Sequence, residues 1–231
     1  APVITRLGLS HGIEMGRLVP MHVEAVIGID KDTLEIEDSS HASLEKKVAT
    51  TAAWIVSNNI STVSVYATRR DYANSFASAL GPEIEAISGS KAWCASVHSG
   101  RTRVASLNGN KLSNDQTLAH FEADTFLTDG VRHKVVVSVG QLKEGFNMPV
   151  LQSVVLLEPS DDAATILQQA GRAMRASKGK TIARLLSFGE EHTAAAIGRM
   201  LNDYDRQCKA VTFGVVPDSY ESQIAAGVDG P

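Results

Sequence analysis

Two arginines and a glutamine are the residues whose types and spacing best suit chemistry. Gln168, Arg172 and Arg175 follow one another at intervals of four and three. On a helix this spacing places the three side chains on one stripe. Guanidinium groups pair well with phosphate oxygens, because their planar fork donates two parallel hydrogen bonds. The pattern predicts a site for a phosphate-bearing ligand. The alternative is a solvated basic face, which most charge clusters form.

A glycine-containing loop precedes this helix. Residues 135–139 and 154–157 are short apolar runs rich in valine, which predicts two buried strands. Residues 140–149 connect them, and Gly145 lets the backbone approach a ligand closely, since a side chain would block that position. The turn formers at residues 159–161 then predict the start of the helix. A strand, a loop and a basic helix therefore follow one another in order.

These segments resemble known motifs. Gln168-x-x-Gly171-Arg172-x-x-Arg175 is similar to motif VI of superfamily 2 helicases, and residues 138–149, with 144–149 at their centre, are similar to motif V. A predicted strand at residues 62–67 and the turn that follows it resemble motif IV. The resemblance implies the second, C-terminal RecA-like domain of a two-domain nucleic-acid-dependent ATPase.

The resemblance also implies roles for single residues at an ATP site. Arg175 is the expected arginine finger with Arg172 beside it, because positive charge at the γ-phosphate stabilises the charge that develops during phosphoryl transfer. Gln168 is expected to position the phosphates. The remaining contacts with ATP fall to Gly145, Asn147 and Gly171. Asn147 stands where the family usually has Asp, which puts the family's ribose contact in doubt at this position.

A nucleic-acid strand is the second ligand that the resemblance implies. The loops after the predicted strands supply the expected contacts, namely Thr68, Arg69, Ser138 and Lys143. For Thr68 and Arg69 the alternative is a helix cap and a solvated surface arginine. A weak similarity of residues 16–20 to the inter-domain linker of DNA-type helicases favours DNA over RNA.

Two parts of an ATPase have no match in the sequence. There is no P-loop and no Asp-Glu-x-Asp/His box, so ATP and Mg²⁺ are expected to be bound mainly by an N-terminal RecA-like domain of the same polypeptide. This chain alone is expected to be inactive. Gly179-Lys180-Thr181 looks like the end of a P-loop, but Met174 replaces its first glycine and a strand is predicted to follow, so we predict a turn.

The alternation of strands and helices predicts the α/β class, a RecA-like parallel sheet with helices on both faces. Residues 1–30 are interpreted as an inter-domain linker and first strand, 31–210 as the RecA-like domain, and 211–231 as an extension or tail. Four helices are predicted. The first is Leu44–Ser57, and the second begins in a capping box at residues 68–71 and ends at Gly81-Pro82. The third begins in another capping box at residues 113–116, and the fourth spans residues 190–206. Between the second and third helices, we predict that the sheet strand begins at Arg103, with residues 94–100 as an insertion or an extra edge strand.

Composition excludes several classes of protein. No apolar run approaches the roughly 20 residues of a transmembrane helix, and no secretory leader is recognisable, so we expect an intracellular protein without a membrane partner. The seven histidines include no HxxxH pair and the two cysteines are far apart, so no metal site is expected. The net charge is −4, yet five basic and no acidic residues lie from position 168 to position 184, which is consistent with a phosphate-facing cleft.

Two hypotheses compete with a helicase or translocase motor. One is a catalytically silent RecA-like module that binds nucleic acid or a protein partner. The other is a stand-alone nucleotide-binding α/β protein, which should bind ATP by itself.

Overall fold

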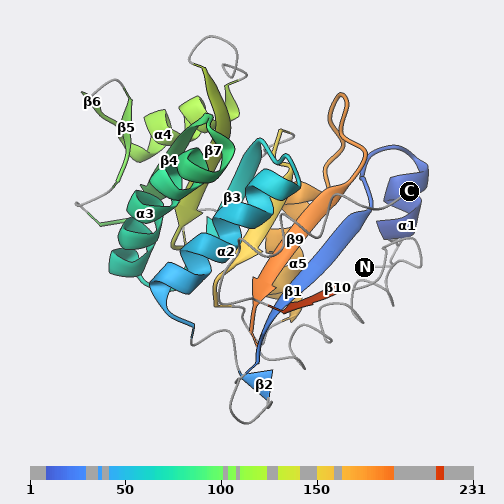
Figure 1. Cartoon of the computed structure of the whole chain (residues 1–231). Helices are drawn as coiled ribbons and strands as arrows, with labels where there is room; N and C mark the ends of the chain where they lie inside the picture. The colour runs from blue at the N-terminus through green and yellow to red at the C-terminus, as the bar shows by residue number, and fades with distance from the viewer. Residues whose placement is uncertain are drawn as a thin grey trace.

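A largely parallel sheet forms the middle layer of the protein (Figure 1). The computed structural model describes residues 9–29, 36–37, 42–100, 104–107, 110–123, 130–140, 150–158, 163–189 and 212–215. The strands lie in the order β10-β1-β9-β8-β3-β7-β4, and neighbours in this order run parallel. Their bounds are β1 Met21–Ile29, β3 Thr62–Tyr66, β4 Lys91–Val97, β7 Val131–Ser138, β8 Ser153–Leu156, β9 Ala183–Phe188 and β10 Thr212–Val215. Strand β2 (Ile36–Glu37) pairs antiparallel with β1, and β5 (Ser106–Leu107) and β6 (Asn110–Lys111) form a separate hairpin.

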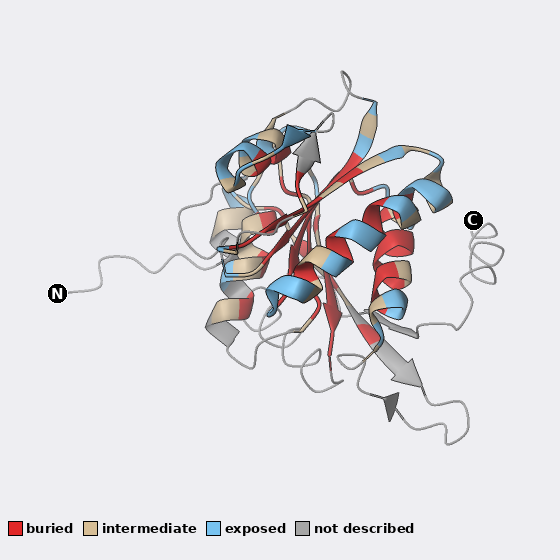
Figure 2. Cartoon of the chain, turned by 90° about the vertical axis from the view of Figure 1, so that its left-hand side faces the viewer, coloured by how far each residue is buried: buried red, intermediate tan, exposed pale blue. Residues whose placement is uncertain are grey.

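Helices cover both faces of the sheet. Helices α2 (Leu44–Ser57) and α3 (Arg70–Ser88) pack on one face, while α4 (Asn114–Glu122) and α5 (Ala163–Ala173) pack on the other; α1 (Leu9–Glu14) precedes β1. Figure 2 shows the buried residues gathered in the sheet and on the inner faces of the helices. In β7, Val135 and Val137 face the core between the sheet and helices α2 and α3. Val136 faces the core between the sheet and helices α4 and α5, as the two-residue period of a strand requires. The predicted parallel sheet with helices on both faces is confirmed.

Local sequence signals located two helices correctly. Helix α2 has the predicted bounds, and the Ser43 hydroxyl accepts a hydrogen bond from the Lys46 amide at 3.3 Å. The predicted capping box of α4 is also present: Ser113 Oγ accepts from the Gln116 amide at 3.2 Å, and Gln116 Oε1 accepts from the Ser113 amide at 2.9 Å. The predicted helix at residues 190–206 lies outside the described residues.

The predicted bounds of α3 are wrong at both ends. The helix begins at Arg70 with Arg69 as a cap that makes no side-chain capping bond, so residues 68–71 form no capping box. It runs through Gly81 and Pro82 to Ser88, and Gly89 ends it with φ 66. A proline inside a helix costs roughly 3 kcal/mol. Continuation beyond Pro82 buries Ile84 completely, and this tertiary packing overrides the local signal.

The sheet strand that follows α3 begins earlier than the predicted start at Arg103. Strand β4 (Lys91–Val97) lies at the edge of the sheet beside β7, in agreement with the alternative of an edge strand at residues 94–100, whereas β5 and β6 pair with each other in a separate hairpin. The reason is burial, since Trp93, Ala95 and Val97 lie in the core on one face of β4. The Trp93 ring meets the His120 ring of α4 edge-on, with 4.6 Å between their centroids.

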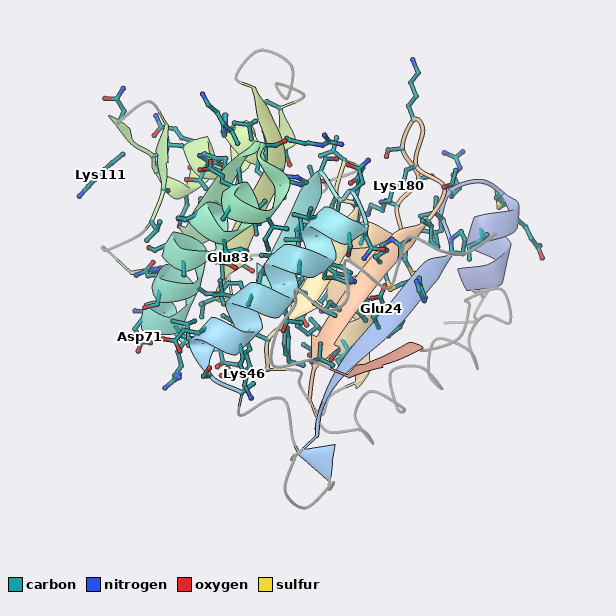
Figure 3. The ribbon with its side chains drawn as sticks, viewed as in Figure 1. Glu24, Lys46, Asp71, Glu83, Lys111 and Lys180 are labelled. Carbon is teal, nitrogen blue, oxygen red and sulfur yellow. The ribbon has the colours of Figure 1, made fainter. Side chains whose placement is uncertain are left out.

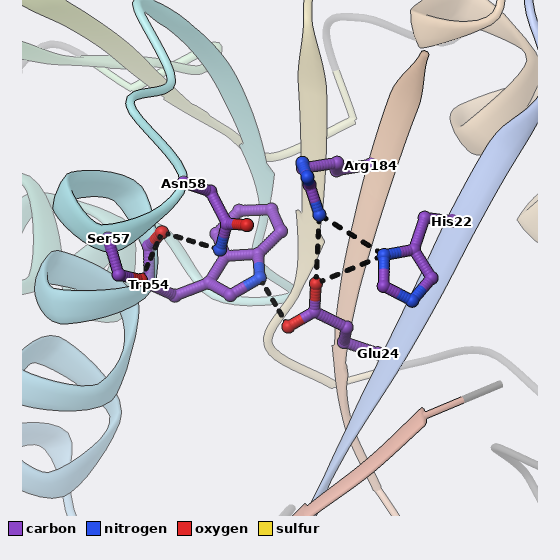
Figure 4. A network of polar contacts seen from close by, with 6 residues as sticks. All are labelled: His22, Glu24, Trp54, Ser57, Asn58 and Arg184. Atoms are coloured by element: carbon purple, nitrogen blue, oxygen red, sulfur yellow. Dashed lines mark hydrogen bonds and ion pairs between the residues drawn. The ribbon is translucent and has the colours of Figure 1, made fainter. Parts of the chain in front are cut away.

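A polar network ties α2 to β1 and β9 (Figure 4). The Trp54 indole donates to Glu24 Oε2 at 2.8 Å, and Arg184 Nη1 lies 3.3 Å from Glu24 Oε1. Arg184 Nη1 also lies 3.1 Å from His22 Nδ1. Because Trp54 leaves α2 near its C-terminal end, this network fixes that end of the helix over the two strands.

His133 is expected to make the fold sensitive to acid. Its side chain is buried at the start of β7, and Nδ1 donates to the Ile60 carbonyl at 2.6 Å. Burial lowers its pKa below the usual value, so the unfolded chain takes up this proton first as pH falls. The stability contributed by the neutral ring is complete above the unfolded pKa of about 6.5 and is lost as pH falls from there through the depressed folded pKa.

We therefore expect the free energy of unfolding, measured with urea, to fall on the order of 1 kcal/mol between about pH 7.5 and about pH 5.5. In His133→Gln this acid-dependent loss should shrink. An undiminished loss in the variant would show that other groups cause it.

Candidate functional site at the carboxyl edge of the sheet

The carboxyl ends of β3, β7 and β8 lie side by side at one edge of the sheet. The Ala67 amide donates to the Ser138 carbonyl at 3.0 Å, and the Leu157 amide donates to the Tyr66 carbonyl at 3.2 Å. These bonds fix the segments that follow the three strands against one another. Ligands of open α/β sheets bind at this edge, because the loops that leave the strands can converge on one point there.

Thr68 and Arg69, two of the residues predicted to bind nucleic acid, are exposed at this edge. Thr68 Oγ1 donates to Glu158 Oε2, which joins the loops after β3 and β8. The Arg69 guanidinium lies 5.7 Å from the centroid of the Tyr72 ring, within the range of a cation–π interaction. Burial, and then the nearby Glu158 carboxylate, raise the pKa of Tyr72 to about 12, while Arg69 opposes this shift.

A buried lysine supports this edge from α2. Lys47 is 1% exposed, and its ammonium group donates to the Leu157 carbonyl at 2.9 Å. The same nitrogen lies 5.7 Å from the ring centroids of both Tyr72 and Phe188. Lys47 therefore links α2 to the end of β8 and to Tyr72 of α3.

Sequence reasoning missed both Lys47 and Glu158. The signal for Lys47 is that Thr51 and Trp54 follow it at helical spacing and are buried like it, which makes the buried face of α2 wider than its apolar stripe. The signal for Glu158 is an acidic residue immediately after the predicted strand at residues 154–157, where parallel sheets place functional groups.

Ser138 is at the predicted edge but inside the protein. Its side chain is fully buried, and its hydroxyl donates to the Val65 carbonyl at 3.5 Å. In this arrangement it links the ends of β7 and β3. Lys143, Gly145 and Asn147 lie outside the described residues.

Helix α5 carries Arg172 near its C-terminal end, at the amino edge of the sheet, where Lys180 joins the next residue, Ala173, to the Leu151 carbonyl just before β8. Arg172 is half-buried and close enough to the Tyr66 hydroxyl to lower the pKa of this group, against the larger raising effect of burial. Gln168 is exposed one helical turn earlier. A Cβ atom added at Gly171 would meet no heavy atom within 4 Å, so the space beside this residue is open.

The helical spacing predicted for Arg175 is wrong, because α5 ends at Ala173. Arg175 is exposed beyond the helix and forms an antiparallel bridge with Leu18. The Val19 amide donates to the Met174 carbonyl at 2.7 Å, and the Ala176 amide donates to the Arg17 carbonyl at 3.1 Å. Pairing with residues 17–19 draws the backbone out of the helix, so Arg175 is placed by this pairing and Arg172 by α5.

The lysine of the P-loop-like sequence has a structural environment. Lys180 lies in the turn between α5 and β9, and β9 follows it as a strand (Figure 3). No helix begins there to bind phosphate, so the prediction of a turn is confirmed. The ammonium group of Lys180 donates to backbone carbonyls at the end of α5 and before β8.

A shallow pocket of about 830 Å³ lies at the opposite, amino edge of the sheet. None of the predicted site residues lines it. Its lining residues are Asn59, Ser61, Gly89, Ser90, Lys91, Gly130, Val131, Arg132 and Gln152. Across the described ranges, no group of three or more His, Cys, Asp or Glu side chains is arranged to hold a metal ion. Likewise, no helix in the part of the chain that the structure describes has the length and apolar character to cross a membrane.

Comparisons with known proteins give similar structures at low sequence identity. No protein-family model matches the sequence, and no curated protein matches it. A fragment assigned to the HsdR subunit of a type I restriction enzyme from Vibrio vulnificus YJ016 is 16% identical with a TM-score of 0.63, over 93% of this chain and 40% of that one. The ATP-dependent Type ISP restriction-modification enzyme LlaBIII bound to DNA is 14% identical with a TM-score of 0.60, over 97% of this chain and 18% of that one.

A third structure consists of a helicase domain of comparable size. Domain 2 of the DEAD-box helicase Mss116p, bound to an RNA duplex, is 17% identical with a TM-score of 0.52, over 90% of this chain and 70% of that one. The chain thus spans less than half the length of the first two proteins and most of the isolated helicase domain. Together with the parallel sheet and the order of its elements, these similarities show that the chain has a RecA-like fold like that of a helicase domain.

Proposed function

We propose that this chain is the C-terminal motor domain of a nucleic-acid-dependent ATPase, a helicase or translocase of superfamily 2. One observation carries the proposal. Arg172 on α5 is close enough to Tyr66, the last residue of β3, to lower the pKa of its hydroxyl, and the loop with Thr68 and Arg69 directly follows β3, so this strand connects the proposed phosphate-binding residues with the proposed nucleic-acid-binding loop. A motor needs such a connection, because ATP hydrolysis must change the grip on nucleic acid.

The ATP half of the proposal rests on α5 and the segment after it. ATP is the substrate, held with Mg²⁺ mainly by an N-terminal RecA-like domain of the same polypeptide. Arg175, exposed beyond the helix, and Arg172 reach the γ-phosphate and stabilise its developing charge, while Gln168 positions the phosphates. Gly171, beside open space, leaves room for the nucleotide, and the proposed site is completed by Gly145 and Asn147.

The nucleic-acid half rests on the loops of the carboxyl edge. Arg69 and Lys143 pair with backbone phosphates, and Thr68 offers its hydroxyl to the same strand. Ser138 contributes by fixing the end of β7 beside the end of β3. The similar structures include one bound to DNA and one bound to an RNA duplex, so either strand fits the proposal, and the preference for DNA stays a prediction.

One observation favours a silent interaction module as the second candidate. Glu158 occupies the hydroxyl of Thr68 and places a carboxylate beside the predicted phosphate contact. Such a charge repels a nucleic-acid backbone unless the strand displaces it. A module that no longer binds nucleic acid would keep the fold and bind a protein partner instead.

A binding experiment tests the nucleic-acid half. Binding of this chain to fluorescent single-stranded DNA and RNA is measured by anisotropy over a range of salt concentrations. Arg69→Ala is expected to weaken binding roughly 3- to 10-fold and to reduce the salt slope by about 1. Arg132→Ala is the matched control, because Arg132 lies at the opposite edge and donates to Asn59 Oδ1 at 2.8 Å. An equal loss in both variants would contradict a specific grip at the carboxyl edge.

A further inference from the structure

Lys180 bonds to backbone carbonyls from two distant segments. Its Nζ lies 3.0 Å from the Arg175 carbonyl oxygen and also donates to the Ala173 carbonyl. On its other side the same nitrogen lies 2.5 Å from the Leu151 carbonyl oxygen, just before β8. One ammonium group therefore joins the segment that carries Arg175 to the sheet. Figure 3 shows Lys180 in the loop that leads into β9.

The chemistry of this contact explains why a cation is needed. The last carbonyls of a helix have no partner within the helix and carry the negative end of its dipole. An ammonium group offers three donors and a positive charge, so it satisfies three carbonyls at once. The half-buried position takes this group partly out of water, and burial lowers the pKa of Lys180 to about 8. A neutral side chain of the same length would leave the three carbonyls without this donor.

The opposite side of the Arg175 segment is held by the N-terminal part of the chain. Residues 17–19 pair with residues 174–176 through the Val19 and Ala176 amides, at 2.7 and 3.1 Å. Residues 174–176 are thus fixed between the Lys180 ammonium group and a backbone pairing. The exposed Arg175 side chain leaves from the middle of this clamp, so the clamp sets its direction.

We infer that Lys180 is a positioning residue for the Arg175 guanidinium and couples it to residues 17–19. The inference deepens the proposed function and rests on it, because Arg175 must reach ATP for its position to matter. In the proposed motor, residues 17–19 belong to the connection with the N-terminal domain. A displacement of that domain then pulls on the backbone that carries Arg175, and Lys180 prevents this segment from rotating away.

The chain offers a matched control two residues away. Lys178 lies in the same turn and is exposed, so Lys178→Met and Lys180→Met remove the same charge from the same turn. Only the second substitution removes the donor to the three carbonyls. Long-range electrostatic effects should therefore be equal in the two variants, and differences between them report on the clamp.

The first experiment needs no ATP hydrolysis. Amide hydrogen exchange of the Val19 and Ala176 amides is measured in this chain, relative to amides of β7 as an internal reference for global stability. In Lys180→Met these two amides should exchange about tenfold faster relative to β7, and in Lys178→Met their exchange should not change. Equal exchange in both variants, or an increase shared by β7, overturns the clamp.

The second experiment tests the catalytic consequence in the longer polypeptide that contains both motor domains. In Lys180→Met, kcat for nucleic-acid-stimulated ATP hydrolysis is expected to fall about tenfold with KM for ATP within about twofold, since only the transition-state contact is misplaced. Lys178→Met should match the unsubstituted protein. If Lys180→Met keeps the full kcat while the separate variant Arg175→Ala is inactive, the positioning role is overturned. Absence of hydrolysis in the unsubstituted protein overturns the proposed function and the catalytic role with it, while the exchange result decides the clamp separately.

Discussion

Replacement of Arg175 with alanine is expected to reduce ATP hydrolysis by the longer polypeptide about 10³-fold or more while ATP still binds. A guanidinium group at the γ-phosphate stabilises charge that develops only in the transition state, so its loss lowers kcat far more than it weakens substrate binding. Arg175 is exposed beyond the end of α5, so the substitution removes no core packing. Steady-state hydrolysis at saturating nucleic acid measures the effect.

The control for this prediction is Lys178→Ala, which removes a positive charge from an exposed position in the following turn. The kcat of this variant should stay within about twofold of that of the unsubstituted protein, because solvent and salt largely screen the effect of an exposed charge on the ATP site. If Arg175→Ala retains kcat within about tenfold, Arg175 is not the arginine finger. A large loss in Arg172→Ala would then transfer the role to Arg172.

The largest expected loss of stability at the candidate site comes from Lys47→Ala, at about 3 kcal/mol. The substitution removes a fully buried side chain, its donor to the Leu157 carbonyl and its contacts with two aromatic rings. The Leu157 carbonyl loses its charged partner, and the volume of the lysine stem becomes a cavity. Urea unfolding followed by circular dichroism measures the free energy of unfolding.

Two further variants separate the causes. Lys46→Ala changes the exposed neighbour in the same turn of α2 and should alter stability by less than about 0.5 kcal/mol (Figure 3). Lys47→Met keeps most of the buried volume and loses the charge and the donor, so its effect should fall between the other two. If Lys47→Ala unfolds at the same urea concentration as Lys46→Ala, the buried contacts of Lys47 do not stabilise the edge.

The sequence predicted the sheet and the layer order because both depend on local patterns. The valine-rich strands β3, β7 and β8 are buried on both faces, so each appears as a short continuous apolar run. Helix α2 could be located because Ser43 and Asn58 mark its ends and apolar residues repeat at helical spacing between them. These signals need no knowledge of distant parts of the chain.

The errors occurred where contacts between distant segments override local signals. Packing of Ile84 carries α3 through Pro82, and pairing with Leu18 takes Arg175 out of the helical stripe. The support of the candidate site is long-range in the same way, since Lys47 bonds to a carbonyl 110 positions away. The partners of Glu158 and Lys180 also include distant segments, so the apolar patterns used for prediction did not mark Lys47 and Glu158 at the carboxyl edge or Lys180 at the end of α5.

The most direct test of the central claim is ATP hydrolysis by the longer polypeptide with and without single- and double-stranded DNA and RNA. If this chain is half of a motor, at least one nucleic acid should stimulate hydrolysis, and Arg175→Ala should abolish the stimulated rate while nucleic-acid binding persists. Stimulation by one nucleic acid alone would also identify the nucleic acid along which the motor moves. An intact, folded polypeptide that hydrolyses no ATP under any of these conditions would contradict the motor and leave the silent interaction module.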